Sequence, residues 1–229
     1  MYFMNDLKIA FWDWNGTLWN DTYQWYLAAK AAYAHANIAE EMTLNRLQDA
    51  FDVPVQEVIH TLGAPRDLPQ ENHDRLLKTF VKVLEENEDL ASVREHASEA
   101  LSFFANQGAE NFLVSNHPIS LLRKELGKGN LTHFFETICG NDNHDQVYTK
   151  GTKSERVGQH LKETGIDPRQ ACIIADTREE IRIARQFGMV SIAITGGYNS
   201  LKVLHDEKPD HLIEHLSEIP ALFQTVKPT

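Results

Sequence analysis

The sequence predicts an α/β fold, with a mostly parallel sheet and a small helical domain inserted after the first strand. Short apolar runs bounded by turn residues indicate buried strands, and helical segments alternate with them after residue 90. Between about residues 22 and 90 the chain contains only amphipathic segments with a helical period. Because strands alternating with crossover helices form a parallel sheet covered on both faces, we expect a core of residues 1–20 and 91–229 and a helical insertion of residues 21–90.

The expected elements follow from apolar patterns and capping residues. Strands are predicted at residues 7–12, 111–115, 137–139, 171–175, 190–194 and 211–213. Core helices are predicted at residues 93–107, 119–126, 154–164 and 179–187, and insertion helices at 22–37, 43–51, 55–62 and 70–87. Ser92 and Glu95 have the spacing of a capping box, which predicts a helix start there. Gly108, Gly165 and Gly188 stand where helix C-terminal caps are expected.

The charge balance limits the classes of partner. The 229 residues include 22 Lys and Arg against 33 Asp and Glu, a formal net charge of −11. This excess argues against nucleic acid or an anionic membrane as the main partner, but it allows a phosphorylated small molecule. We find no membrane-length apolar run and no secretory signal, so we expect a cytoplasmic protein. Cys139 and Cys172 lie in predicted strands and are expected to be reduced, buried thiols.

The first predicted strand ends on an acidic residue. Asp13 follows the apolar run, and Asn15-Gly16 is a strong turn signal. Ligands of open α/β sheets bind beyond the carboxyl ends of the strands, where a carboxylate can act as a nucleophile or hold a hard cation. A strand followed by an ordinary capped turn is the alternative.

Two later segments carry groups that bind anions. Ser115 and Asn116 end a predicted strand ahead of Pro118, which we expect in the first turn of the next helix. An ordinary N-cap is the alternative. Lys150 and Lys153 precede another helix, where an anionic partner would offset their unfavourable interaction with the helix dipole. Exposed surface lysines are the alternative.

A second apolar strand, at residues 171–175, ends on an aspartate. Asp176 follows it, and Glu180 comes four residues later. Two strand-end aspartates side by side are costly unless a cation lies between them, and this arrangement suits octahedral Mg²⁺ with several waters. An N-cap role for Asp176 is the alternative. The four segments together place a carboxylate, a hydroxyl, a lysine and a second carboxylate at one edge of the sheet. This combination is a more specific sign of a functional site than any single segment.

With these four segments in order, the sequence resembles the haloacid dehalogenase-like (HAD) phosphatase superfamily, in its phosphoglycolate phosphatase-like branch. The resemblance covers most of the chain. It implies a Rossmann-like core with an α-helical cap, and a Mg²⁺-dependent phosphatase that acts on a small phosphorylated metabolite through an aspartyl-phosphate intermediate. The resemblance carries no information on the oligomeric state.

The resemblance also implies roles for single residues. Asp13 would be the nucleophile, and Lys153 would bind both the phosphate and Asp13, with Lys150 as the second candidate. Substrate phosphate would be bound by Thr17, Ser115, Asn116 and Lys153. Mg²⁺ would be held by Asp13, the backbone carbonyl of Asn15, Asp176 and, through water, Glu180. Ala175 stands where the family motif has glycine.

Asn15 departs from the family motif, which has an aspartate there as general acid and base. An amide cannot carry that proton, so we expect a slow phosphatase, with a loss of about 10²–10⁴-fold. A phosphonate (C–P bond) hydrolase is an alternative, because the phosphonatases of this superfamily also lack the second aspartate of the first motif. In such an enzyme Lys30 would form an imine with the substrate. A catalytically degenerate phosphate-binding protein is another alternative. Aromatic residues after the first strand are expected mainly in the cap core: Trp19, Tyr23, Trp25, Tyr26 and Tyr33.

Overall fold

The computed structural model describes residues 7–35, 42–141 and 152–223. Within these residues, a six-stranded sheet has the strand order β5-β4-β1-β6-β7-β8, and every neighbouring pair is parallel. The strands are β1 (Ile9–Trp12), β4 (Glu110–Pro118), β5 (Thr137–Asn141), β6 (Ala171–Ala175), β7 (Val190–Ile194) and β8 (His211–Ile213). The predicted α/β class and parallel sheet are confirmed.

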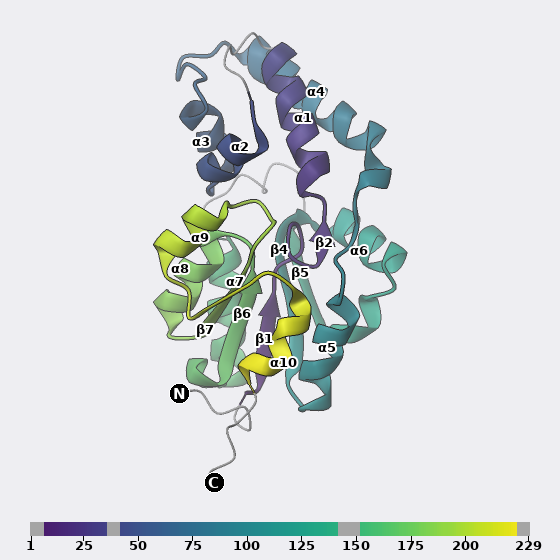
Figure 1. Cartoon of the computed structure of the whole chain (residues 1–229), viewed down its shortest axis with the longest axis vertical. Helices are drawn as coiled ribbons and strands as arrows, with labels where there is room; N and C mark the ends of the chain where they lie inside the picture. Colours follow the sequence, from purple (N-terminus) through teal and green to yellow (C-terminus); the bar gives the residue numbers. More distant parts are fainter. Residues whose placement is uncertain (1–6, 36–41, 142–151, 224–229) are drawn as a thin grey trace.

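Helices cover both faces of this sheet (Figure 1). One face packs against α5 (Ala97–Asn106), α6 (Ile119–Lys128) and α10 (Ile219–Leu222). The other face packs against α7 (Thr152–Thr164), α8 (Arg178–Phe187) and α9 (Leu201–Glu207). The residues of β1 alternate between the two faces, with Ala10 and Trp12 in the first apolar cluster and Ile9 and Phe11 in the second. The central strand is therefore fully buried, and its carboxyl end lies between those of β4 and β6.

Four helices lie beyond the carboxyl ends of the strands, at the top of Figure 1. They are α1 (Thr22–His35), α2 (Leu44–Ala50), α3 (Val55–Thr61) and α4 (Gln70–Glu86), close to the predicted segments. They share an apolar cluster that includes Trp25, Tyr33 and Leu47, and Tyr198 of the core packs against it. Trp19 instead stacks on Trp14 in the main core. We call residues 21–90 the cap. The division of the chain into this cap and a core of residues 1–20 and 91–229 stays a prediction.

The segments that join the cap to the core form a small antiparallel sheet that we did not predict. Its strands are β2 (Trp19–Asn20) and β3 (Ser92–Val93). The expected capping box of Ser92 and Glu95 is wrong, because α5 begins only at Ala97. Pairing with β2 holds Ser92 and Val93 extended, so the helix starts after them.

β4 extends past its predicted end. It continues to Pro118, and α6 begins at Ile119, so neither Ser115 nor Pro118 lies in a helix. Asn141 Nδ2 donates to Asn116 O at 2.8 Å, which is a tertiary contact that the local sequence pattern does not contain.

Most other features of the described residues agree with the predictions. Gly108, Gly165 and Gly188 have positive φ, as helix C-terminal caps require. Cys139 lies in β5 and Cys172 in β6, and both are free thiols. Cys172 is buried as expected, but the expectation of a buried Cys139 is wrong, because this residue lies in the edge strand and is only half-buried. No helix in the described ranges has the length and apolarity to cross a membrane.

Candidate active site

Asp13 lies directly beyond β1, at the carboxyl end of the central strand. Its backbone N–H donates to Ile174 O of β6 at 3.0 Å, so sheet pairing holds the residue in place. Its side chain is buried, and Lys153 Nζ, from the first turn of α7, donates to Asp13 Oδ1 at 2.9 Å. Asp13 Oδ2 accepts no hydrogen bond within the part of the chain that the structure describes. One oxygen of this carboxylate is thus paired with a cation, and the other is available to a ligand.

Lys153 is the centre of a buried cluster of opposite charges. Its Nζ also donates to Glu180 Oε1 and lies 3.8 Å from Glu179 Oε2. Burial lowers the pKa of Lys153, but the carboxylates of Asp13, Glu180 and Glu179 outweigh it and raise that pKa well above its usual value. Burial raises the pKa of Asp13, and Glu180 and Asp176 raise it further. The ammonium group therefore stays charged, while the carboxylates around it repel one another.

Asp176 follows β6, the strand next to β1, and is fully buried. Thr17 Oγ1 donates to its Oδ1 at 2.6 Å, and the Tyr198 N–H donates to its Oδ2 at 2.6 Å. A Cβ on Gly16 or on Gly197 would lie 2.2 Å from Oδ2, so only glycine lets these two loops approach the carboxylate. Burial raises the pKa of Asp176 to about 6, against the opposing effect of the two hydrogen bonds.

Glu180 lies in α8 and is fully buried. Lys153 donates to its Oε1, and Thr177 Oγ1 donates to its Oε2 at 2.5 Å. Both oxygens therefore have protein partners, and Glu180 helps to hold Lys153 against Asp13. A role in metal binding stays a prediction for this residue.

Ser115 and Asn116 lie near the carboxyl end of β4, on the other side of β1 from β6. Ser115 is buried, and its Oγ accepts a hydrogen bond from the His117 N–H at 3.0 Å, which leaves the hydroxyl hydrogen available to an anion. Asn116 Nδ2 donates to Glu179 Oε2 at 2.9 Å. Burial raises the pKa of Glu179 to about 7.

Asn15 turns its amide toward an acidic residue that sequence reasoning missed. Asn15 Nδ2 donates to Asp21 Oδ2 at 2.7 Å, and the Gly16 N–H donates to Asp21 Oδ1 at 3.0 Å. The Tyr198 hydroxyl also donates to Asp21 Oδ2, at 2.9 Å. Asp21 is buried, which raises its pKa. No motif surrounds Asp21 in the sequence, so only the fold reveals this contact.

Among the described residues at this edge of the sheet, carboxylates outnumber cations. The largely buried carboxylates are Asp13, Asp21, Asp176, Glu179 and Glu180. The cations that the structure describes beside them include Lys153, Arg94 and Arg156. The Arg94 guanidinium donates to Gly16 O and Thr195 O, and that of Arg156 donates to Ser115 O at 2.9 Å. In the described ranges no three His, Cys, Asp or Glu side chains are arranged to hold a metal ion. Mg²⁺ needs only one or two carboxylates with further oxygens and waters, and a divalent cation would relieve the repulsion between Asp13 and Asp176. The donor set therefore fits Mg²⁺.

The predicted residues thus converge at the ends of three adjacent strands and the first turns of α7 and α8. They are Asp13, Asn15, Thr17, Ser115, Asn116, Lys153, Asp176 and Glu180. Lys150 lies outside the described residues. Lys30 is exposed on α1, with Nζ 5.7 Å from the ring centroid of Tyr26. Sequence reasoning did not identify Asp21, Arg94, Glu179 or Tyr198, because each joins the site only through tertiary contacts.

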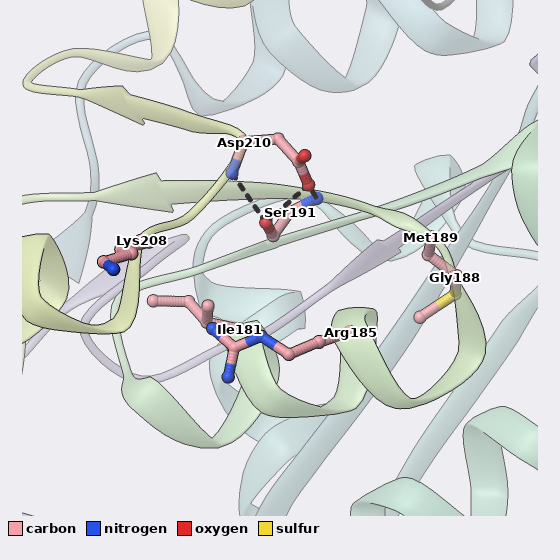
Figure 2. A pocket seen from close by; sticks show the side chains of 7 residues that line it. All are labelled: Ile181, Arg185, Gly188, Met189, Ser191, Lys208 and Asp210. Atoms are coloured by element: carbon pink, nitrogen blue, oxygen red, sulfur yellow. Dashed lines mark hydrogen bonds between the residues drawn. The ribbon is translucent and has the colours of Figure 1, made fainter.

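A hollow of about 230 Å³ lies elsewhere, at the amino end of β7. Figure 2 shows it between α8 and the segment that leads to β8. Its polar groups bind one another: Ser191 N–H and Oγ donate to Asp210 Oδ2, and Asp210 N–H donates to Ser191 Oγ. The catalytic candidates lie at the opposite ends of the parallel strands, so this hollow is not part of the site.

The family model described as haloacid dehalogenase-like hydrolase matches residues 10–194, which span every candidate site residue. The chain belongs to this family. This is the superfamily that the resemblance of its motifs predicted.

Individual relatives of this haloacid dehalogenase-like chain are distant in sequence. It is 27% identical to a phosphoglycolate phosphatase of Salmonella typhi over 168 residues, which cover 71% of this chain and 66% of the relative. It is 24% identical to a probable phosphoglycolate phosphatase of Pseudomonas putida, over 61% of this chain and 55% of the relative. The chain therefore aligns with about half to two thirds of these relatives' lengths.

The same fold occurs in solved structures. A predicted phosphoglycolate phosphatase from Haemophilus somnus 129PT superposes with a TM-score of 0.76 at 19% identity, over 96% of this chain and 99% of that one. A hydrolase from Pseudomonas syringae has a TM-score of 0.74 at 17% identity, over 94% of this chain and 97% of that one. The Rossmann-like core with added helices is thus a recurrent arrangement.

Proposed function

We propose that the chain is a Mg²⁺-dependent phosphatase that hydrolyses a small phosphorylated metabolite through an aspartyl-phosphate on Asp13. The observation that supports this most is the 2.9 Å contact between the Lys153 ammonium and the buried carboxylate of Asp13, beside Asp176. Phosphoryl transfer depends mainly on positioning and charge neutralisation, and this cluster is built for both.

In the first step, an oxygen of Asp13 attacks phosphorus while the bond from phosphorus to the ester oxygen breaks, and the leaving group departs as an anion that takes its proton from solvent water. Lys153, with the donors of Ser115 and Asn116, stabilises the negative charge on the phosphoryl oxygens. In the second step, water attacks the same phosphorus and loses a proton to solvent, the bond from phosphorus to the Asp13 oxygen breaks, and phosphate leaves as the Asp13 carboxylate is restored. Mg²⁺ bound by Asp13 and Asp176 would neutralise further negative charge on the phosphoryl group. Thr17 acts as a positioning residue for Asp176, because its hydroxyl donates to that carboxylate.

The reaction is expected to be slow for poor leaving groups. The amide of Asn15 cannot give a proton to a departing alcohol or take one from water, a loss of about 10²–10⁴-fold. Acyl and aryl phosphates leave without such help, so the penalty is smallest for them. The aspartyl-phosphate should then accumulate during turnover.

Two observations support a small substrate. Asp13, Thr17, Ser115, Lys153 and Asp176 are all buried beneath the cap. The curated relatives of Salmonella typhi and Pseudomonas putida are named phosphoglycolate phosphatases. We therefore take 2-phosphoglycolate as the first metabolite to test.

The experiment compares the wild-type chain with Asp13→Asn, using acetyl phosphate, p-nitrophenyl phosphate and 2-phosphoglycolate with Mg²⁺ or with EDTA. We expect Mg²⁺-dependent release of phosphate that Asp13→Asn abolishes. Asp206→Asn is the matched control, because Asp206 is an exposed acid of α9 that takes no part in the site. Equal rates in wild type and Asp13→Asn would refute the proposed function.

A further inference from the structure

Asp21 is the residue directly before α1, and its backbone carbonyl accepts the Trp25 N–H at 2.9 Å. Its carboxylate turns away from that helix and into the core. It binds three donors from separate places: the Asn15 amide, the Gly16 N–H and the Tyr198 hydroxyl, at 2.7, 3.0 and 2.9 Å. This acidic side chain therefore joins the loop after β1, the loop after β7 and the start of the cap.

The contact between Asp21 and Asn15 restricts which residue fits at position 15. It requires a donor from residue 15, and the asparagine amide supplies one. An aspartate in the same rotamer would place two carboxylate oxygens at that distance, with no donor between them. The loop has little freedom to separate them, because Arg94 donates to Gly16 O and Asp176 fills the space beside Gly16.

We propose that Asp21 is a positioning residue that fixes the Asn15 side chain and the Gly16 backbone, and that Asn15 and Asp21 form a matched pair in which asparagine at position 15 is the residue that Asp21 requires. The catalytic part of this inference rests on the proposed function. It follows that Asn15→Asp removes the donor that Asp21 accepts, whereas Asn15→Asp combined with Asp21→Asn restores a donor and an acceptor between the two positions.

Tyr198 also binds Asp21 and so supports the pair of Asn15 and Asp21. Its ring stacks on Trp25 of α1 with centroids 4.6 Å apart, and its hydroxyl donates to the same Asp21 oxygen as Asn15. Tyr198→Phe removes one donor to Asp21 but leaves the Asn15 contact. The matched control is Tyr26→Phe, because the Tyr26 hydroxyl donates to Met42 O inside the cap and not to Asp21.

The test measures kcat on p-nitrophenyl phosphate with saturating Mg²⁺ in wild type, Asn15→Asp, Asp21→Asn and the double variant Asn15→Asp/Asp21→Asn. We expect Asn15→Asp alone to gain nothing and Asp21→Asn alone to lose several-fold. The double variant should exceed wild type at least tenfold, because the new amide at position 21 then donates to a working carboxylate at position 15. A gain in Asn15→Asp alone as large as in the double variant would overturn the pairing.

Thermal unfolding of the same four proteins tests the pair without any catalysis. Each single variant should have a lower midpoint than wild type, and the double variant should recover most of the loss; a single variant that fails to fold while the double variant folds has the same meaning. Additive losses would overturn the inference. If wild type and Asp13→Asn are equally inactive, the proposed function fails, and the unfolding midpoints still decide whether Asp21 and Asn15 are paired.

Discussion

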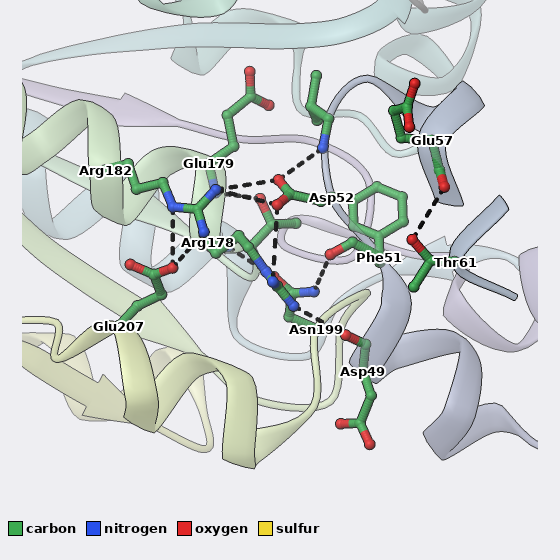
Figure 3. A network of polar contacts seen from close by, with 12 residues as sticks. Asp49, Phe51, Asp52, Glu57, Thr61, Arg178, Glu179, Arg182, Asn199 and Glu207 are labelled. Atoms are coloured by element: carbon green, nitrogen blue, oxygen red, sulfur yellow. Dashed lines mark hydrogen bonds and ion pairs between the residues drawn. The ribbon is translucent and has the colours of Figure 1, made fainter. Parts of the chain in front are cut away.

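Helix α8 contributes charged side chains to two regions that differ in burial. At its start, Glu180 binds Lys153 in the site, and the two side chains are 0% and 4% exposed. Two residues further along, Arg182 is 46% exposed and binds Asp52 of the cap at 3.1 Å and Glu207 at 2.6 Å. The second group is drawn in Figure 3. Water screens the exposed pairs, whereas removing one partner from the buried group leaves a charge without compensation.

The exposed group nevertheless lies where the cap meets the core. There, hydrogen bonds between neutral groups accompany the ion pairs: Asn199 Nδ2 donates to Phe51 O at 2.9 Å, and the Arg178 backbone N–H donates to Asn199 Oδ1 at 2.7 Å. Asn199 is fully buried. We therefore expect burial, rather than the number of charges, to decide how much stability is lost when one partner of each group is removed.

The largest effect should come from removing the buried cation. Lys153→Met keeps the length of the side chain but leaves Asp13 and Glu180 without their partner, so we expect a loss of about 3–5 kcal/mol in the free energy of unfolding. Phosphatase activity should be lost as well. Chemical denaturation measures the first effect, with Lys202→Met as control, since Lys202 is an exposed residue of α9. A similar loss in both variants would contradict the comparison.

The next effect concerns the space around Asp176. Gly197→Ala would place a Cβ 2.2 Å from Asp176 Oδ2, so the loop after β7 must shift. We expect a loss of about 1–3 kcal/mol in stability, together with weaker Mg²⁺ activation. Gly127→Ala is the matched control: it adds a Cβ in open space within α6, and should stabilise the protein by about 0.5–1 kcal/mol. Unchanged activity in Gly197→Ala would argue that the position of Asp176 is not critical.

The stability of the buried site should depend on pH. Burial raises the pKa of Asp176 to about 6 and that of Glu179 to about 7, above their values of roughly 4 in an unfolded chain. Between these values the folded state binds more protons than the unfolded state, so stability falls as pH rises. In EDTA we expect unfolding in urea to be easier at pH 7.5 than at pH 5.5, by about 1–2 kcal/mol, and Mg²⁺ to restore stability at pH 7.5. Stability that rises over this interval in EDTA would contradict the assignment.

The smallest effect should come from the exposed pairs. Arg182→Ala removes the contacts with Asp52 and Glu207, and we expect a loss of about 0.2–1 kcal/mol that shrinks further in high salt. Denaturation at low and high ionic strength measures it. A loss as large as that of Lys153→Met would show that exposed charges hold the cap as firmly as buried charges hold the site.

The α/β class, the helical cap segments and the strand ends that carry Asp13 and Asp176 could all be predicted from the sequence. These features depend on apolar period, turn residues and caps, which act over a few neighbouring residues. The sequence also indicated Ser115 as part of the same site, because parallel strands bring their carboxyl ends to the same edge of a sheet, while the family resemblance favoured Lys153 over Lys150.

Other features became evident only in the folded chain. Ser92 and Val93 pair with β2 instead of starting a helix, and β4 continues to Pro118. The fold also brings Asp21 and Tyr198 together with Asn15, across a sequence separation of up to 183 residues. Such contacts depend on which distant segments pack side by side, and a local pattern contains no information on that. Asn15 is an unexplained exception in the sequence, and the fold gives it a partner.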